Sequence, residues 1–359
     1  SGNFISSTYY MNELPKWVSN FNAQKLVDKY YKDGWNLLYP ANTYVQSTTD
    51  EKPYESKPFG TSFPYNLDKF IGKDFSKIAS LPMGNSLTTE FAKAAIASEQ
   101  LGADDITDFL AVSFSSPDYI GHTFGPNSIE SEDGFLRLDK DLGSLFEYLD
   151  KKVGKGQYTA FLSADHGVAH TPEFMIENKL PGGRVFMGDV VKLLNKTLQE
   201  KHGIKTIIVS DDNYQLHLNH QALDSAKVDV KELTNWIVDY MKAEPGIDRV
   251  FAIADLNIIP LNSTIRTMLN NGYYPKRNGD IQVILKPNYI DAYSKTGTTH
   301  GLWNPYDAHI PLLWYGWGIK EGKTNRETYM TDIAATIAAL LKIQMPNGNV
   351  GHVISEVLK

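Results

Sequence analysis

Cysteine is absent from the 359-residue chain, and this absence excludes several kinds of chemistry at once. Without a thiol, the chain cannot form disulfides, thiolate zinc sites or a cysteine nucleophile. The absence is compatible with an oxidising compartment, but it does not by itself indicate one.

Long apolar runs and basic tracts are also missing. No run of about 18 apolar residues occurs, so we expect no transmembrane helix and no membrane partner. The net charge is −7 and the Lys and Arg residues are not clustered, so we expect no nucleic-acid partner. With 42% hydrophobic and 21% charged residues, the composition is that of a globular protein.

The order of apolar patterns predicts an α/β fold. Apolar runs at 109–114 and 158–162 indicate buried strands, and an amphipathic stripe over 135–149 indicates a helix between them. Strand–helix–strand at this spacing predicts a parallel βαβ unit. A further strand is expected at 310–315. We therefore expect a mixed, mostly parallel central sheet flanked by helices, with an inserted α+β subdomain.

Three segments describe the expected domain organisation. Residues 1–185 form the first part of a core α/β domain, residues 186–290 form the inserted subdomain, and residues 291–359 continue the core. An irregular loop at 29–67 is rich in Tyr, Phe and Trp. Such a loop either covers a functional site or packs onto the body through its aromatic side chains.

The strongest functional signal follows the 158–162 strand. There, Ser163 and Ala164 lead to a carboxylate and an imidazole side by side, Asp165 and His166, before Gly167. Crevices at the C-terminal ends of strands are where open α/β sheets bind ligands. Glycine allows the tight turn that would point both side chains into such a crevice.

Two other stretches carry the same residue types. Asp118 and His122 are four apart, so they can face the same way across one helical turn. His300 lies in a loop of small residues, 297–301. Each motif alone is weak, since an Asp often caps a helix and a His often lies on the surface.

Together, the five side chains predict a binuclear metal centre. Catalytic zinc takes imidazole nitrogen and carboxylate oxygen, and manganese or iron would be the second choice. Five ligands are too many for one tetrahedral ion. They suit two ions about 3.5–4 Å apart, which clamp the attacking and leaving oxygens of a phosphoryl transfer.

Longer stretches around these motifs resemble the alkaline phosphatase superfamily. Within it, they are most similar to the phosphodiesterase/nucleotide-pyrophosphatase-like branch, and especially to the monomeric, periplasmic, phosphate-irrepressible alkaline phosphatases of Bacteroidetes-type bacteria. The stretches that carry the resemblance are 81–86, 108–126, 163–167, 279–287, 297–301, 307–312 and 331–334.

The resemblance implies a complete set of roles. Asp118, His122 and His300 would hold one zinc ion, and Asp165 and His166 would hold the second with a further Asp. A Thr or Ser between the two ions would attack small-molecule phosphate monoesters and form a phospho-enzyme intermediate. The resemblance also implies a monomer and a periplasmic or secreted location.

One part of the family pattern is not found. No stretch in 1–117 resembles the first Asp ligand and the nucleophile, and Thr88 and Thr89 do not follow a ligand Asp. We therefore expect the nucleophile upstream of Ser1, in an N-terminal part that this chain lacks. As it stands, the chain is expected to be inactive by the family mechanism.

Three further residues are candidates for supporting the ligands. Asp307 is expected to hydrogen-bond a ligand histidine, and His309 precedes the strand at 310–315. His170 lies four residues after His166 and is either a supporting residue or a solvated loop histidine.

Alternative functions remain open at this point. The chain could belong to a phosphodiesterase or nucleotide pyrophosphatase of the same superfamily. The preference for mono- or diesters depends on groups that contact the phosphate oxygens. Cofactor-independent phosphoglycerate mutases and calcium-dependent sulfatases fit the pattern less well. If the chain is not part of an enzyme, the alternatives are a non-catalytic metal-binding or scaffold domain and a structural domain without metal.

Overall fold

A computed structural model describes residues 2–359, so Ser1 lies outside the described residues. The helices are α1 (Lys16–Asn22), α2 (Leu26–Asp33), α3 (Met83–Ser98), α4 (Ser116–Phe124), α5 (Ile129–Leu149), α6 (Pro172–Glu177), α7 (Met187–His202), α8 (His220–Ser225), α9 (Val230–Met241), α10 (Ser263–Gly272), α11 (Pro305–Ala308) and α12 (Met330–Leu341). The strands are β1 (Thr159–Ser163), β2 (Gly183–Val185), β3 (Ile208–Ser210), β4 (Gln215–Leu218), β5 (Ile247–Ala252), β6 (Ile281–Leu285), β7 (Tyr289–Asp291) and β8 (Leu312–Gly316).

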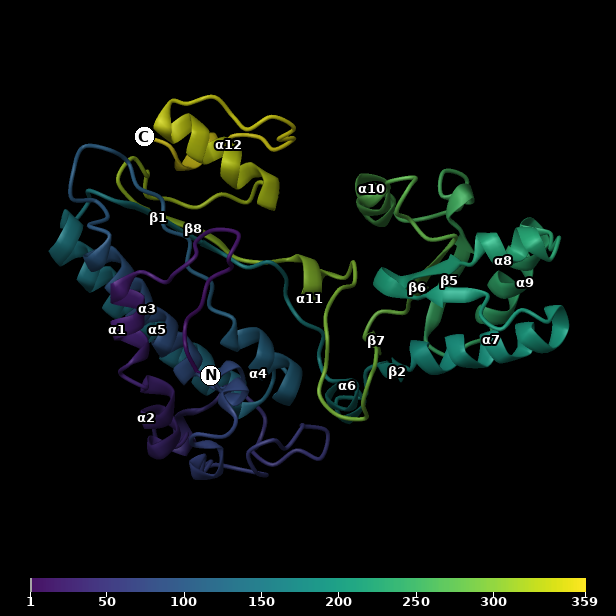
Figure 1. Ribbon diagram of the computed structural model, residues 1–359, viewed down its shortest axis with the longest axis horizontal. Coiled ribbons are helices and arrows are strands. Elements are labelled where there is room, and N and C mark those ends of the chain that lie inside the picture. The colour runs from purple at the N-terminus through teal and green to yellow at the C-terminus, as the bar shows by residue number, and fades with distance from the viewer. Residues whose placement is uncertain (1) are drawn as a thin grey trace.

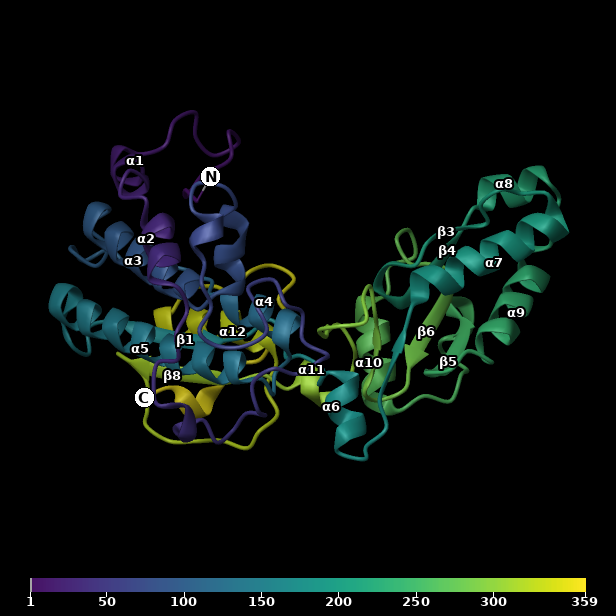
Figure 2. The same cartoon turned by 90° about the horizontal axis from the view of Figure 1, so that it is seen from below.

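These elements gather into two bodies, which both views show (Figures 1 and 2). One contains α1 to α5, β1, β8 and α12; the other contains β3 to β6 with α7 to α10. Between them lie α6, α11 and the short parallel pair of β2 and β7. Within residues 2–359, no helix is both long enough and apolar enough to span a membrane.

The α/β class with mixed sheets is confirmed, but the strand directions differ from the prediction. β1 pairs with β8 antiparallel, with Phe161 opposite Trp314. β3, β4, β6 and β5 form a four-stranded antiparallel sheet in that order. Among the described strands only β2 and β7 run parallel, so the expected mostly parallel sheet is wrong for this chain.

The predicted strand at 109–114 is also wrong. This segment has no regular secondary structure, and Phe109 is 67% exposed although its ring lies 6.4 Å from that of Phe161. An apolar run favours a strand only where a neighbouring strand can complete its backbone hydrogen bonds. Since no ladder forms there, the predicted parallel βαβ unit is absent, although its helix lies within α5 and its second strand corresponds to β1.

The aromatic loop at 29–67 begins with the end of α2 and then packs onto α4. Trp35, Phe59 and Tyr65 are buried in one apolar cluster with Phe124 at the C-terminal end of α4. The indole nitrogen of Trp35 donates to a buried carboxylate oxygen of Asp133 on α5 at 2.7 Å. Because this cluster covers one side of α4, it fixes the helix that carries Asp118 and His122.

The second body has its own apolar core. Side chains of α7 and α9 pack against β4, β5 and β6, and every residue of β6 is buried. Asp229 caps α9 by accepting a hydrogen bond from the Glu232 amide at 3.0 Å. This core continues to Leu302, two residues after His300.

Candidate metal centre

Helix α4 brings Asp118 and His122 together. Pro117 lies in its first turn, where proline is tolerated because no helical hydrogen bond is lost. Asp118 lies in that first turn, where a carboxylate is favourable for the helix dipole, and His122 lies in the last turn. One turn separates them, and the His122 Nε2 atom lies 3.4 Å from Asp118 Oδ1.

The turn after β1 carries Asp165 and His166. Gly167 is required there, because a Cβ at this position would lie 2.1 Å from the Tyr306 carbonyl oxygen. The Gly167 amide donates to the Asp307 carbonyl at 2.7 Å, which ties the turn to α11. The His166 Nδ1 atom donates to the Gly167 carbonyl at 2.7 Å, so its Nε2 atom faces away from the backbone.

The loop that carries His300 is bound to both other stretches. The Thr298 amide donates to the His122 carbonyl at 3.0 Å, and His122 Nδ1 donates to the Thr298 carbonyl at 2.8 Å. The Thr298 hydroxyl donates to the Ala169 carbonyl at 2.9 Å. Thr298 therefore connects α4 with the segment that follows His166, a role that the sequence did not reveal beyond the small residues of this loop.

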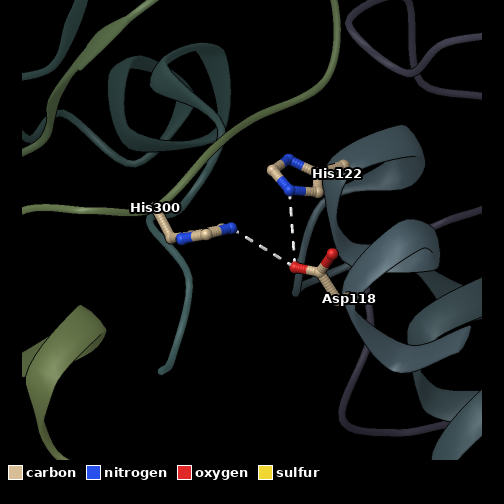
Figure 3. Close-up of side chains that lie close together, drawn as sticks. All are labelled: Asp118, His122 and His300. Carbon is tan, nitrogen blue, oxygen red and sulfur yellow. Dashed lines mark ion pairs between the residues drawn. The ribbon is translucent and has the colours of Figure 1, made fainter. Parts of the chain in front are cut away.

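Three imidazoles converge on one carboxylate oxygen. The Nε2 atoms of His122, His166 and His300 lie 3.4, 3.8 and 3.5 Å from Asp118 Oδ1. Figure 3 shows His122 and His300 directed at Asp118. The His166 and His300 rings stack with centroids 3.4 Å apart. The structure thus brings these four predicted side chains together.

Asp165 completes the group at its exposed edge. Its Oδ2 atom lies 3.5 Å from His166 Nε2, and its side chain is 86% exposed. Within the larger group, Asp118, His122 and His300 each offer one donor atom, and these atoms lie within 4.8 Å of one another. This is the arrangement of a group that could hold a metal ion.

The protonation chemistry of the group fits a divalent cation. Burial lowers the pKa of His300, and the neighbouring His166 and His122 lower it further, while Asp118 opposes them. Metals bind the neutral imidazole that such a shift favours. The backbone carbonyls that accept from the Nδ1 atoms of His122 and His166 also fix the tautomer that leaves Nε2 free.

The three supporting candidates lie in different surroundings. Asp307 is buried, burial raises its pKa, and its Oδ2 atom accepts from the Leu302 amide at 2.8 Å. Its Oδ1 atom has no partner among the described residues, so the expected hydrogen bond to a ligand histidine is not formed.

The two outlying histidines are not part of the group. The His170 Nδ1 atom lies 2.7 Å from Asn127 Oδ1, and burial lowers the pKa of this histidine. His309 is exposed at the end of α11. Thr88 and Thr89 lie within α3, where the Thr88 hydroxyl donates to the Gly84 carbonyl at 2.9 Å.

Comparison with known proteins identifies the family. Residues 4–307 match the Type I phosphodiesterase / nucleotide pyrophosphatase family. The chain belongs to this family. The resemblance found in the sequence motifs is therefore confirmed.

Relatives of known name extend over the whole chain. It is 47% identical to alkaline phosphatase PhoV of Synechococcus elongatus over 365 aligned residues, which cover 100% of the chain and 65% of PhoV. It is also 47% identical to alkaline phosphatase PafA of Elizabethkingia meningoseptica, with 100% of the chain and 66% of PafA covered. The chain thus spans about two thirds of the length of these relatives.

Solved structures agree with this family. The crystal structure of wild-type PafA matches with a TM-score of 0.95 at 46% identity, covering 99% of this chain and 69% of PafA. Murine ectonucleotide pyrophosphatase / phosphodiesterase 5, solved as an inactive variant in complex with AMP, matches with a TM-score of 0.52 at 17% identity. It covers 77% of this chain and 65% of that protein and shows a shared fold.

Proposed function

We propose that a protein containing this chain hydrolyses phosphate monoesters as an alkaline phosphatase. The observation that carries the proposal is the convergence of three imidazole Nε2 atoms on Asp118 Oδ1, at 3.4, 3.8 and 3.5 Å. The names of the two relatives at 47% identity support the choice of monoesters. Small-molecule phosphoesters are therefore the proposed substrates.

Two zinc ions are the proposed cofactors. Asp118, His122 and His300 would hold one ion, and Asp165 and His166 would hold the other with a further carboxylate. When bound, such a pair stabilises negative charge on the oxygens of the transferring phosphoryl group. The chain itself supplies orientation: carbonyls of Thr298 and Gly167 hold two of the imidazoles in position. The exposed side chain of Asp165 leaves one edge of the group open to solvent.

The nucleophile is proposed to lie in the part of the longer relatives that this chain does not match. A Thr or Ser hydroxyl there would form a bond to phosphorus while the bond from phosphorus to the leaving oxygen breaks. Water would then hydrolyse the phospho-enzyme and release phosphate. We expect the 359-residue chain alone to be inactive for the same reason.

Asp307 is proposed as a positioning residue. Its carboxylate accepts from the Leu302 amide at 2.8 Å, and its carbonyl accepts from the Gly167 amide at 2.7 Å. It therefore joins the loop after His300 to the turn that carries His166. His309 and His170 lie outside the group, and no contact supports a comparable role for them.

The sheets of the structure support a division of the chain into domains. We propose residues 186–290 as a subdomain inserted into a core domain formed by 1–185 and 291–359. The antiparallel sheet of β3 to β6 supports this division. We also propose a monomer that is located in the periplasm or outside the cell, which the resemblance to the bacterial enzymes supports.

The activity is tested with two synthetic esters. The longer protein that contains this chain is assayed with p-nitrophenyl phosphate and with bis(p-nitrophenyl) phosphate, and kcat/KM is compared. The proposal expects the monoester to be preferred. A preference for the diester would favour a phosphodiesterase. A His300→Ala variant that keeps its full activity on both esters would contradict the metal assignment.

A further inference from the structure

A buried arginine lies where the chain crosses between the two bodies. The strand β2 is followed directly by α7 of the second body, and β7 leads back to the loop of His300. Both strands lie between the bodies, beside α6 (Figure 1). Arg184 is the middle residue of β2, and its side chain is only 8% exposed. A guanidinium so little exposed needs partners for its charge and for its N–H groups.

The guanidinium of Arg184 binds α6 and the loop of His300 at the same time. Its Nε atom donates to Glu173 Oε1 at 2.9 Å, and its Nη2 atom donates to Glu173 Oε2 at 2.7 Å. The Nη2 atom also donates to the Gly297 carbonyl at 2.8 Å, and Nη1 donates to the Ser294 carbonyl at 3.4 Å. These bonds use four of the five N–H groups of a guanidinium. Glu173 thus orients the guanidinium, which in turn holds the backbone of the loop.

Gly297 is held from two further sides. Its amide donates to the Tyr54 carbonyl at 2.8 Å. Its φ is 72°, and a Cβ there would lie 2.3 Å from the His122 carbonyl oxygen, so the loop is pressed against the last turn of α4. The next residue, Thr298, binds His122, and His300 follows two residues later. A shift of the Gly297 backbone would therefore displace the loop that carries His300.

We propose that Arg184 is a positioning residue for His300. The inference rests on the proposed function, because it takes His300 as a metal ligand. Arg184 is not one of the five proposed ligands and acts through the backbone of residues 294–297. Its neighbour Val185 is buried in the apolar core of the second body. The same strand therefore connects that core with the loop of a metal ligand.

Hydrogen exchange in the metal-free chain tests the positioning without a metal. Arg184→Gln removes the charge and the bidentate pair with Glu173. Peptides that cover 294–301 should then exchange about tenfold faster, because their backbone loses the bonds that hold it. Peptides from β6, in which every residue is buried, should keep their rate and show that the fold is intact. Unchanged exchange of 294–301 overturns the inference.

Arg184→Lys gives a second, milder variant. Lysine keeps the positive charge but cannot form the bidentate pair, so its loop should exchange at a rate between those of Arg184→Gln and the unchanged chain. If Arg184→Gln does not fold, Arg184→Lys carries the test, and exchange as slow as in the unchanged chain then overturns the inference.

Arg326→Gln is the matched control. Arg326 also joins a carboxylate to a backbone carbonyl: its Nε atom lies 3.3 Å from Glu356 Oε1, and its Nη2 atom donates to the Val353 carbonyl at 3.2 Å. These partners lie in the C-terminal part of the chain, away from the loop of His300 in sequence. The control should leave both the exchange of 294–301 and the affinity for zinc unchanged.

A double-mutant cycle separates positioning from a general loss of stability. Arg184→Gln should lower the affinity for zinc about tenfold in a calorimetric titration. In a chain that already carries His300→Ala, the same change should lower the affinity by less than about threefold, because the ligand through which Arg184 acts is gone. Equal factors in the two backgrounds would show that Arg184 does not act through His300.

The two measurements also separate this inference from the proposed function. Faster exchange of 294–301 in Arg184→Gln, in a chain that has no affinity for zinc, would retain Arg184 as the residue that holds this loop and overturn the metal assignment. Zinc binding by the unchanged chain, with neither the exchange nor the affinity altered in Arg184→Gln, would overturn this inference and leave the proposed function intact.

Discussion

His122 and Thr298 exchange two hydrogen bonds across 176 positions of sequence. The Thr298 amide donates to the His122 carbonyl at 3.0 Å, and the His122 Nδ1 atom donates to the Thr298 carbonyl at 2.8 Å. One residue therefore fixes both the backbone and the ring of a proposed ligand. The same residue carries the loop of His300, so two ligands are positioned by a single connection.

Replacing Thr298 with valine tests this connection. The change keeps the backbone bonds to His122 but removes the hydroxyl that donates to Ala169 at 2.9 Å. Because that carbonyl is buried and loses its partner, we expect the free energy of unfolding to fall by about 1–3 kcal/mol. Zinc affinity should fall about tenfold. Chemical unfolding and calorimetric zinc titration measure the two effects, and a Thr298→Ser variant should behave as the unchanged chain does.

Removing a metal ligand should lower the affinity for zinc much more than it lowers the stability of the fold. His122→Ala deletes one of the three imidazoles whose Nε2 atoms lie around Asp118 Oδ1. We expect zinc affinity to fall on the order of 100-fold or more, with only a small change in stability. His352→Ala, at an exposed position, is the control and should bind zinc unchanged. Equal affinities of the two variants would remove His122 from the ligand set.

The turn after β1 should not tolerate a side chain at Gly167. A Cβ there would lie 2.1 Å from the Tyr306 carbonyl oxygen, so Gly167→Ala should lower the free energy of unfolding by about 1–3 kcal/mol. Gly188→Ala in α7 meets nothing within 4 Å and should stabilise the helix by about 0.5–1 kcal/mol. Unfolding curves of the two variants should therefore move in opposite directions. Movement in the same direction would contradict the close approach of Gly167 to the Tyr306 carbonyl.

Stability should fall as the pH rises, because two carboxyl groups, those of Glu55 and Glu130, are buried. Burial, with a contribution from Glu130, raises the pKa of Glu55 from 4.5 to about 8. Burial likewise raises the pKa of Glu130 to about 7. The folded protein thus retains protons that the unfolded chain releases near pH 4.5, so the free energy of unfolding falls between about pH 4.5 and 8.

Glu55→Gln tests this dependence, because a neutral amide removes one of the two titrations. The fall in melting temperature between about pH 5 and pH 8.5 should shrink by about 2–4 °C relative to the unchanged chain. Glu147→Gln, at an exposed position of α5, should keep the full dependence. Identical pH profiles for all three proteins would show that Glu55 does not hold its proton in the folded state.

Sequence patterns predicted the local parts of this molecule better than the pairings between distant parts. Asp118 and His122 could be predicted because one helical turn brings them together. The strand at 109–114 was predicted from its apolar residues and is not formed, because strand pairing depends on a partner elsewhere in the chain. Thr298 carried no signal beyond its small neighbours, and the burial of Glu55 depends on the folded loop that surrounds it.

The most direct test of the account is to locate the metal. Crystals of the chain soaked in zinc are measured at the zinc absorption edge, and the anomalous difference map is inspected. We predict a peak about 2.0–2.2 Å from Asp118 Oδ1 and from the Nε2 atoms of His122 and His300, with a second peak beside Asp165 and His166. A map with zinc elsewhere, or with no peak at these side chains, would contradict the assignment on which the proposed function rests.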